Sequence, residues 1–201
     1  MQIVLVALAA FLLGSIPFAV IVSRAMSLDD PRKYGSGNPG ATNVLRSGNK
    51  KAAILTLIGD ALKGVAAVLL ARGLAQSLHL TEGDAAIAGL FAFLGHVFSV
   101  FLRFQGGKGV ATAAGVLLAM NPAAGGLTLI TWIAVAATTR YSSAAALSAA
   151  VAAPALTYWF VPARAWLLAI TVMSAVLIWR HKDNIVRLLS GQEGKLGRKK
   201  T

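Results

Sequence analysis

Three polar segments, rich in glycine and basic residues, carry the side chains in this sequence that could do chemistry. The first, GSGNPGATNVLR, covers residues 35–46. Glycines allow the backbone to approach a ligand closely, and successive exposed N–H groups form a concave binding site for anions. Ser36, Thr42 and Asn43 add hydroxyl and amide groups, and the planar guanidinium of Arg46 suits phosphate oxygens. The segment therefore indicates phosphate binding; a flexible, turn-rich linker is the alternative.

A second glycine-rich segment, QGGKGVAT, covers residues 105–112 and leads into an apolar run. We expect it to open a helix, whose N-terminus offers unpaired N–H groups and a positive dipole end to an anion. Lys108 adds a full positive charge. This is not a nucleotide-binding P-loop, because Lys108 is followed by Gly109 and no glycine lies five residues before Gly107. A positively charged turn between two helices is the alternative.

The third segment, HKDNIVRLLSG, covers residues 181–191 near the end of the chain. His181 and Asn184 are three residues apart and share one face of a predicted helix, with Arg187 three residues further along. The alternative is an amphipathic surface helix, with its apolar residues in the membrane interface and its bases on lipid headgroups.

The elements that must position these segments are apolar helices. The chain is 57% hydrophobic and only 13% charged, with a mean hydropathy of +0.70, which excludes an ordinary soluble domain. An apolar helix of about 20 residues crosses a bilayer core of roughly 30 Å. We count seven apolar runs, at residues 2–23, 52–72, 85–102, 110–120, 123–139, 142–161 and 165–180.

The fourth run is too short to span squarely and ends at Asn121-Pro122, since proline cannot continue a helix. Six spans, or a broken pair, therefore remain open. We expect an all-α polytopic membrane protein with about seven transmembrane helices, folded as a single domain over residues 1–201. The first run lacks a basic n-region and is predicted to be a retained helix. The absence of cysteine excludes disulfides, thiolate metal sites and a cysteine nucleophile.

Charge placement predicts the orientation of the chain in the membrane. The net charge is +12, and 16 of the 19 lysines and arginines lie in residues 24–51, residues 103–109, at Arg140 and in the tail from Arg180. By the positive-inside rule these segments are cytoplasmic, the N-terminus lies outside and the C-terminus is cytoplasmic. The bases are better explained by topology and anionic ligands than by nucleic acid, so we expect no nucleic-acid partner.

Two ionisable residues lie within the second apolar run. Asp60 and Lys63 are three residues apart, and ionisable groups in membrane helices are usually paired or functional. We expect a structural ion pair that braces the loop region. His96 is predicted to be a hydrogen-bonded structural histidine. An H-x4-D match from His79 to Asp84, typical of another lipid acyltransferase superfamily, is interpreted as a chance match in an outward loop.

Taken together, the three segments resemble the PlsY family of bacterial acyl-phosphate:glycerol-3-phosphate acyltransferases. The signatures match in order as GSGNPGATNVLR at 35–46, GGKGVAT at 106–112 and HKDNIVRLLSGQE at 181–193. Supporting matches are GSIPF at 14–18, DPRKYG at 30–35, GDALKG at 59–64 and GHVFSVFLRF at 95–104. The sequence departs at Ser99, where proline is usual, and at Gln105, where lysine is common. These two departures affect local helix geometry and one positive charge.

The resemblance implies a seven-helix fold in the cell inner membrane with its active site at the cytoplasmic face. It implies acyl transfer from acyl phosphate to the sn-1 hydroxyl of glycerol 3-phosphate, giving lysophosphatidic acid and phosphate, without cofactor or metal. The implied catalytic residues, which would hold glycerol 3-phosphate, are Ser36, Arg46, Lys108, His181 and Asn184. The implied substrate-binding residues, with the first six cradling acyl phosphate, are Gly37, Asn38, Gly40, Ala41, Thr42, Asn43, Gly106, Gly107, Gly109 and Thr112. The acyl tail would lie among the membrane helices, in contact with membrane lipid.

An acyl phosphate is a mixed anhydride and is already activated, so positioning and charge stabilisation matter more than a strong nucleophile. We therefore predict direct attack by the glycerol hydroxyl, without an acyl-enzyme. His181 could accept the proton, but a phosphate oxygen of the donor is the preferred acceptor. Two other classes remain open: a transporter for a phosphorylated solute, and a structural subunit that binds acidic lipids. Acyl-chain preference and oligomeric state do not follow from the sequence.

Overall fold

The computed structural model describes residues 2–196, and the described part of the chain is helical without strands. The tail bases beyond residue 196 lie outside the described residues. The longer helices are α1 (Gln2–Ser15), α2 (Phe18–Ala25), α4 (Lys50–Gly73), α6 (Glu82–Val97), α7 (Val110–Met120), α8 (Pro122–Thr139), α9 (Ser142–Phe160), α10 (Arg164–Arg180) and α11 (Lys182–Leu189). The short elements are α3 (Ala41–Val44), α5 (Ala75–Leu78) and two 3₁₀ turns, Leu45–Ser47 and Val100–Leu102.

Five segments of the described chain are long and apolar enough to cross a membrane. They are Gln2–Ala25, Lys50–Gly73, Glu82–Leu102, Pro122–Thr139 and Ser142–Phe160. The prediction of an all-helical, multi-span membrane protein is thereby confirmed. The count of seven spans stays a prediction, because α7 and α10 are shorter than these five segments. The orientation of the termini also stays a prediction.

The first apolar run is not one helix, as the sequence suggested, but two. It breaks at Ile16-Pro17, between α1 and α2, because proline lacks the N–H that would continue the helix. The break frees the carbonyl of Ile16, which accepts a hydrogen bond from Lys63 Nζ at 3.0 Å. A buried lysine of α4 therefore compensates the broken backbone of its neighbour.

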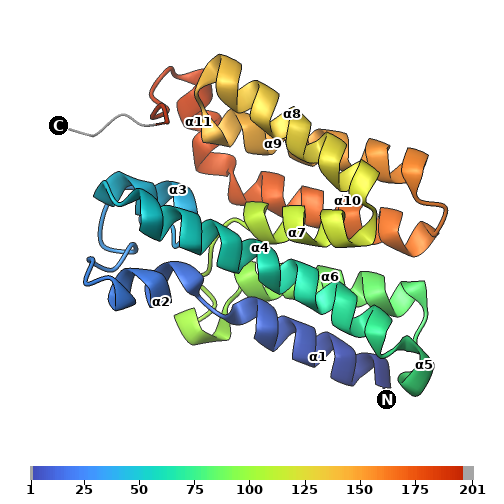
Figure 1. Cartoon of the computed structure of the whole chain (residues 1–201). Helices are drawn as coiled ribbons and strands as arrows, with labels where there is room; N and C mark the ends of the chain where they lie inside the picture. The colour runs from blue at the N-terminus through green and yellow to red at the C-terminus, as the bar shows by residue number, and fades with distance from the viewer. Residues whose placement is uncertain (1, 197–201) are drawn as a thin grey trace.

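The helices form two groups, which meet through α7 and through the packing of α10 on α6. On one side α1 packs on α6, and α4 packs on α6 and α7; on the other, α9 packs on α8 and α10 (Figure 1). The short α7 also contacts α8 and thus lies between the two groups. The segments α2, α3 and α11 gather at one end of the molecule, whereas α5 and the N-terminus lie at the opposite end (Figure 1).

Glycines bring α4 and α7 into close contact. A Cβ atom at Gly64 would collide with the carbonyl oxygen of Thr112, and one at Gly115 with that of Ala61. Small residues allow membrane helices to pack closely, because association there relies on van der Waals contact. The start of α7, which follows the loop that contains Lys108, is therefore held at a fixed place beside α4.

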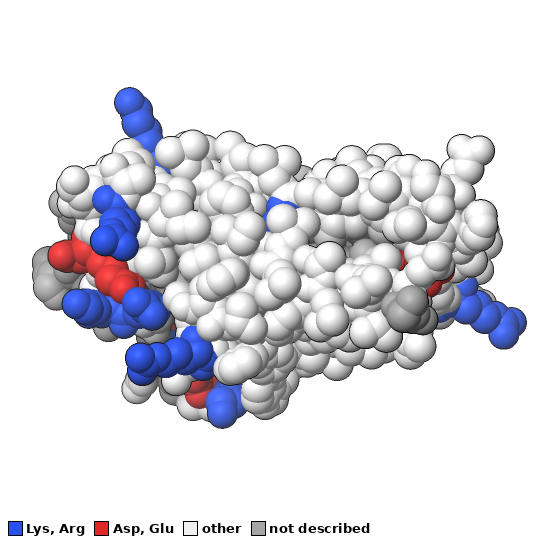
Figure 2. Space-filling model, turned by 90° about the horizontal axis from the view of Figure 1, so that it is seen from below, with Lys and Arg blue, Asp and Glu red and all other residues white. Residues whose placement is uncertain are grey.

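Charged side chains gather at the two ends of the molecule, and a broad band with very little charge separates them (Figure 2). The long helices expose large apolar side chains, among them Leu5, Leu69 and Ile133. An apolar surface between two charged ends is the pattern expected of helices that face lipid.

The predicted boundary after Met120 is also present: Asn121 Oδ1 accepts hydrogen bonds from the N–H groups of Ala123 and Ala124, so it caps α8.

Candidate active site

A cavity of about 590 Å³ joins the three polar segments to the apolar interior. Its polar end is lined by residues far apart in the chain. All five residues predicted to be catalytic are among them, namely Ser36, Arg46, Lys108, His181 and Asn184. Of the predicted substrate-binding residues, the lining includes Asn38, Gly40, Ala41, Thr42, Asn43 and Gly109.

Asn43 organises the segment 35–46 from within. Its side chain is buried, and Oδ1 accepts hydrogen bonds from the Ser36 N–H at 2.9 Å and from Arg46 Nη1 at 3.4 Å. Its Nδ2 donates to the carbonyl oxygens of Pro31 at 2.6 Å and Tyr34 at 3.2 Å. The amide therefore places Ser36 and Arg46 beside each other. Asn43 touches the cavity, but its polar atoms already have protein partners, so its main role differs from the predicted ligand contact.

The tip of this segment is tied to a distant helix. The hydroxyls of Thr42 and Ser142, the first residue of α9, are 3.2 Å apart. Gly35 and Gly37 have φ of +63° and +68°, a backbone conformation that favours glycine. Gly37 itself is outside the cavity lining, so its contribution is the turn rather than the predicted direct contact.

The segment 105–109 folds back on the end of α6 and places two of the predicted ligand residues, Gly106 and Gly107, outside the cavity lining. The N–H groups of Gly106 and Gly107 donate to the carbonyl oxygens of Val97 and His96, each at 3.1 Å. A Cβ atom at Gly107 would collide with His96 Nε2. Because both N–H groups are engaged and neither residue lines the cavity, these glycines shape the loop rather than bind phosphate.

Lys108 is the charged residue of this loop that reaches the cavity. Its Nζ donates to Asn184 Oδ1, which links the loop to α11. Burial, and then the nearby charge of Arg187, lower the pKa of Lys108 to about 8. A cation with this pKa stays mostly protonated at neutral pH and gains strongly from an anionic ligand.

Glu193 is a site residue that sequence reasoning missed. Its carboxylate accepts hydrogen bonds from Asn184 Nδ2 at 2.7 Å, from the Ser143 hydroxyl at 2.7 Å and from Arg187 Nε at 2.8 Å. Burial would raise the pKa of Glu193, but these hydrogen bonds lower it below the usual value. A carboxylate in a predicted phosphate site was unexpected. The sequence offered one indication of its role: Glu193 is the only acidic residue after Asp183.

His181 is held in one orientation at the end of α10. Its side chain is buried, and its Nδ1 lies 2.8 Å from the carbonyl oxygen of Leu177. A carbonyl can only accept, so Nδ1 carries the proton, and the other ring nitrogen of the neutral imidazole is an acceptor. Burial lowers the pKa of His181 to about 4, so the ring is neutral at pH 7. It can accept a hydrogen bond but is a weak base.

Thr112 and Lys63 lie behind the cavity wall, whereas their partners Asp60 and His96 are part of the cavity lining. Thr112 was expected to bind substrate, but it is fully buried, outside the lining, and its hydroxyl donates to the Asp60 carbonyl at 2.8 Å between α7 and α4. Lys63 Nζ lies 2.9 Å from Asp60 Oδ1, which also lies 3.4 Å from His96 Nδ1. This buried group joins α4 and α6 directly behind the Gly107 turn.

The fold and the site define a class: a helical, multi-span membrane protein with a basic, hydroxyl-lined pocket that continues into an apolar cavity. The family described as glycerol-3-phosphate acyltransferase matches residues 4–191. A glycerol-3-phosphate acyltransferase of Paraburkholderia phytofirmans is 60% identical over 200 residues, covering 100% of this chain and 94% of the relative. One of Burkholderia thailandensis is 57% identical over 205 residues, covering 100% and 99%.

Two crystal structures of PlsY (YgiH), an integral membrane glycerol 3-phosphate acyltransferase, share the fold. The glycerol 3-phosphate form has a TM-score of 0.89 and 35% identity, covering 98% of this chain and 96% of that chain. The lysophosphatidic acid form has a TM-score of 0.88 and 34% identity, with the same coverage. This chain belongs to the glycerol-3-phosphate acyltransferase family, and the resemblance drawn from its three motifs is confirmed.

Proposed function

We propose that this protein transfers an acyl group from acyl phosphate to the sn-1 hydroxyl of glycerol 3-phosphate. The observation that carries the proposal is the single cavity that joins five polar residues to an apolar channel between α7, α8, α9 and α10. A polar acceptor and an activated lipid donor must meet at one point, and this cavity has a compartment suited to each. The relatives named above are glycerol-3-phosphate acyltransferases, which supports the acceptor.

In this proposal the phosphate of glycerol 3-phosphate lies between Arg46 and Lys108, two of the three lysine and arginine residues that line the cavity; the third is Lys50. The guanidinium binds two oxygens at once, and the ammonium supplies a point charge. Ser36, His181 and Asn184 hold the glycerol hydroxyls. This assignment uses the neutral His181 as an acceptor, which fits an alcohol ligand better than a phosphate.

The acyl phosphate lies along Asn38, Gly40, Ala41 and Thr42, with its chain among the membrane helices. The sn-1 oxygen attacks the acyl carbon directly, the new ester C–O bond forms, and the C–O bond to phosphate breaks. The hydroxyl proton passes to an oxygen of the departing phosphate, giving lysophosphatidic acid and inorganic phosphate. The low pKa of His181 favours this acceptor over the imidazole, because a base with a pKa of about 4 holds a proton weakly at pH 7.

We further propose that residues 1–201 form one domain with seven membrane helices in the cell inner membrane. The N-terminus lies outside, and the active site faces the cytoplasm. The charged loops that build the site lie at the end of the molecule opposite α5 and the N-terminus, which supports this orientation.

The donor is tested with purified protein, glycerol 3-phosphate and three alternative donors: acyl phosphate, acyl-CoA and acyl carrier protein. We expect phosphate release and lysophosphatidic acid only with acyl phosphate. Trapping of an acylated Ser36 on the normal reaction path would overturn direct transfer. Product formation in detergent, without a vesicle, distinguishes the enzyme from a transporter.

The reaction is proposed to need no metal or other cofactor. Among residues 2–196 no three histidine, aspartate or glutamate side chains are grouped as metal ligands. Assay after treatment with EDTA, and after addition of Mg²⁺ or Zn²⁺, tests the proposal: unchanged turnover is expected, and a metal-dependent recovery would contradict it.

A further inference from the structure

The cavity does not end at the polar site but continues deep between the helices. It follows α9 from Ser142 to Ala153 and α10 from His181 back to Ile170. Each of these runs covers twelve residues, so its ends are eleven steps apart, which at 1.5 Å of rise per residue is about 16 Å. The wall of this inner part consists of apolar and small side chains, so it suits a hydrocarbon chain.

The inner end of the cavity is closed, whereas one side is open. Leu117, Ala153 and Ile170 line the inner end and are 4%, 3% and 1% exposed, so packed side chains lie beneath them. Nearer the polar site, Leu57 of α4 and Leu129 of α8 line the cavity and are exposed. A chain can therefore enter sideways from the bilayer between α4 and α8, and it meets a floor at its far end.

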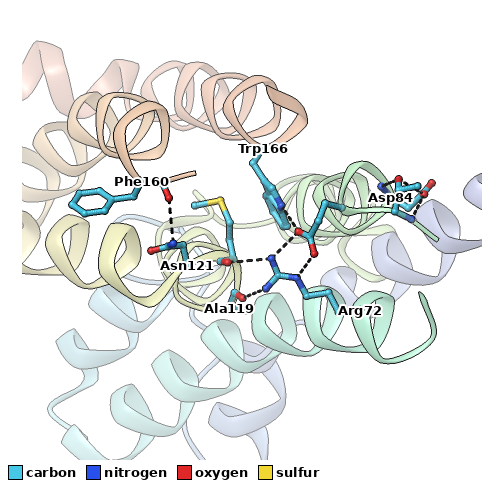
Figure 3. Close-up of polar contacts among 9 residues, drawn as sticks. Arg72, Asp84, Ala119, Asn121, Phe160 and Trp166 are labelled. Carbon is cyan, nitrogen blue, oxygen red and sulfur yellow. Dashed lines mark hydrogen bonds and ion pairs between the residues drawn. The ribbon is translucent and has the colours of Figure 1, made fainter. Parts of the chain in front are cut away.

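Trp166 supports this floor from below. It is fully buried and lies one turn from Ile170 on the same face of α10. Its Nε1 donates to Glu82 Oε2 at 2.8 Å, and the Arg72 guanidinium lies 5.7 Å from the centre of its ring (Figure 3). Arg72 in turn donates to both carboxylate oxygens of Glu82, at 3.0 and 2.7 Å.

The same arginine fixes the end of α7. Arg72 donates to the carbonyl oxygens of Ala119 and Met120 at 2.6 and 3.1 Å (Figure 3). These carbonyls belong to the last turn of the helix and lack helical partners. One polar cluster thus ties α4, α6, α7 and α10 together directly below the floor, so the floor has little freedom to recede.

We propose that the floor formed by Leu117, Ala153 and Ile170 stops the methyl end of the donor's acyl chain and sets the chain length that fits. This inference rests on the proposed function, since it assumes an acyl phosphate in the cavity. Carbon–carbon bonds of about 1.5 Å in a zigzag advance roughly 1.3 Å each, so about 16 Å holds a straight chain of about 13 carbons.

The test compares acyl phosphates of 8 to 18 carbons in one detergent, using kcat/KM for each donor. Ala153→Phe raises the floor, because its ring fills the end of the cavity. We expect the 16-carbon donor to lose about 10-fold relative to the 8-carbon donor, within the range for inserting bulk into a packed interior. The KM for glycerol 3-phosphate stays unchanged. Ala155→Phe is the matched control, because Ala155 is exposed on the same helix and outside the cavity.

Ile170→Val and Ile170→Ala test the opposite direction, since they shorten a buried side chain and add no bulk, and Ile170→Val is the milder of the two changes for the fold. They deepen the cavity, so the ratio of 16- to 8-carbon turnover rises, more for alanine than for valine. An unchanged ratio in the Ile170 variants, or a fall, overturns the floor proposal. Turnover of acyl phosphate by the wild-type protein is measured in the same panel. If the wild-type protein does not turn over acyl phosphate, the proposed donor is refuted. If it does, but the ratio of 16- to 8-carbon turnover is the same in the variants, only the floor proposal is refuted.

Discussion

At the scale of single residues, the site depends on a chain of polar contacts that begins at Lys108. The ammonium binds Asn184, which binds Glu193, and Glu193 also binds Ser143 and Arg187. Glu193 balances part of the positive charge that the two proposed phosphate-bearing substrates would require. The cations can therefore remain close together in the free protein, ready for the ligand.

Removing Arg46 or Lys108, the two cations assigned to the phosphate of glycerol 3-phosphate, is expected to nearly abolish turnover. Arg46→Ala and Lys108→Ala each lower kcat/KM by about 100-fold or more, because a positioned charge partner of the reacting centre is lost. Steady-state kinetics on purified variants measures the effect. Arg24→Ala and Lys33→Ala are matched controls, since both side chains are exposed and lie outside the cavity. Rates like those of the wild type in either site variant would refute the assignment.

The pKa of Lys108 makes acceptor binding sensitive to alkaline pH. The charged form binds phosphate and is present below the pKa of about 8. As pH rises above 8 the ammonium loses its proton, so kcat/KM for glycerol 3-phosphate falls by up to about 10-fold per pH unit. Lys108→Arg stays charged and removes this alkaline decline, even if its activity is lower. A flat wild-type profile between pH 7 and 9.5 would contradict the role of the ammonium.

At the scale of elements, the loop before α7 is shaped by contact with α6 more than by its own sequence. The N–H groups of Gly106 and Gly107 pair with the end of α6, and Gly109 has φ of +86°. Arg180 Nη2 donates to the Gly106 carbonyl at 3.0 Å and fastens the loop to α10. Lys108 is thus placed by contacts of its loop with α6 and α10, two helices that are far apart in the sequence.

A side chain at Gly107 is expected to displace Lys108. The added Cβ would collide with His96 Nε2, so Gly107→Leu blocks activity and Gly107→Ala lowers kcat/KM for glycerol 3-phosphate by about 10-fold. Gly126→Ala is the control, because a Cβ there meets no atom within 4 Å. His96→Ala makes room, so the double variant with Gly107→Ala should lose less than the two single losses combined. Additive losses, or normal binding of both substrates by Gly107→Leu, would disprove the steric account.

At the scale of the whole molecule, the two ends of the helical bundle have different roles. One end holds the charged loops and the mouth of the cavity, and the other holds the cluster of Arg72, Glu82 and Trp166 below the floor. The first must admit a soluble acceptor, whereas the second only has to stay closed. We propose that the first end faces the cytoplasm, as the positive-inside rule predicts.

The natural absence of cysteine makes this orientation directly testable. Ser77→Cys lies at the end that contains α5, and Ser190→Cys follows α11 at the other end; both positions are exposed. A membrane-impermeant maleimide should label Cys at position 77 in right-side-out vesicles and Cys at position 190 in inverted ones. Detergent-permeabilised vesicles provide the full-labelling control, and the reverse pattern would refute the proposed topology.

The sequence by itself determined the helical class, most helix boundaries and the three polar segments whose residue types suit phosphate. These follow from local properties: apolar length, the stop at Asn121-Pro122, and dense glycine, hydroxyl and basic residues at 35–46. The break at Pro17 was equally local, but a continuous apolar run concealed it.

Only the tertiary structure decided which polar atoms remain free for a ligand. Thr112 and the N–H groups of Gly106 and Gly107 are occupied by distant parts of the chain, and Glu193 is brought in by α9 and α11. The depth of the cavity likewise depends on Ile170 and its support by Trp166. Such contacts join residues many positions apart, and the close packing of helices, not the local sequence pattern, determines them.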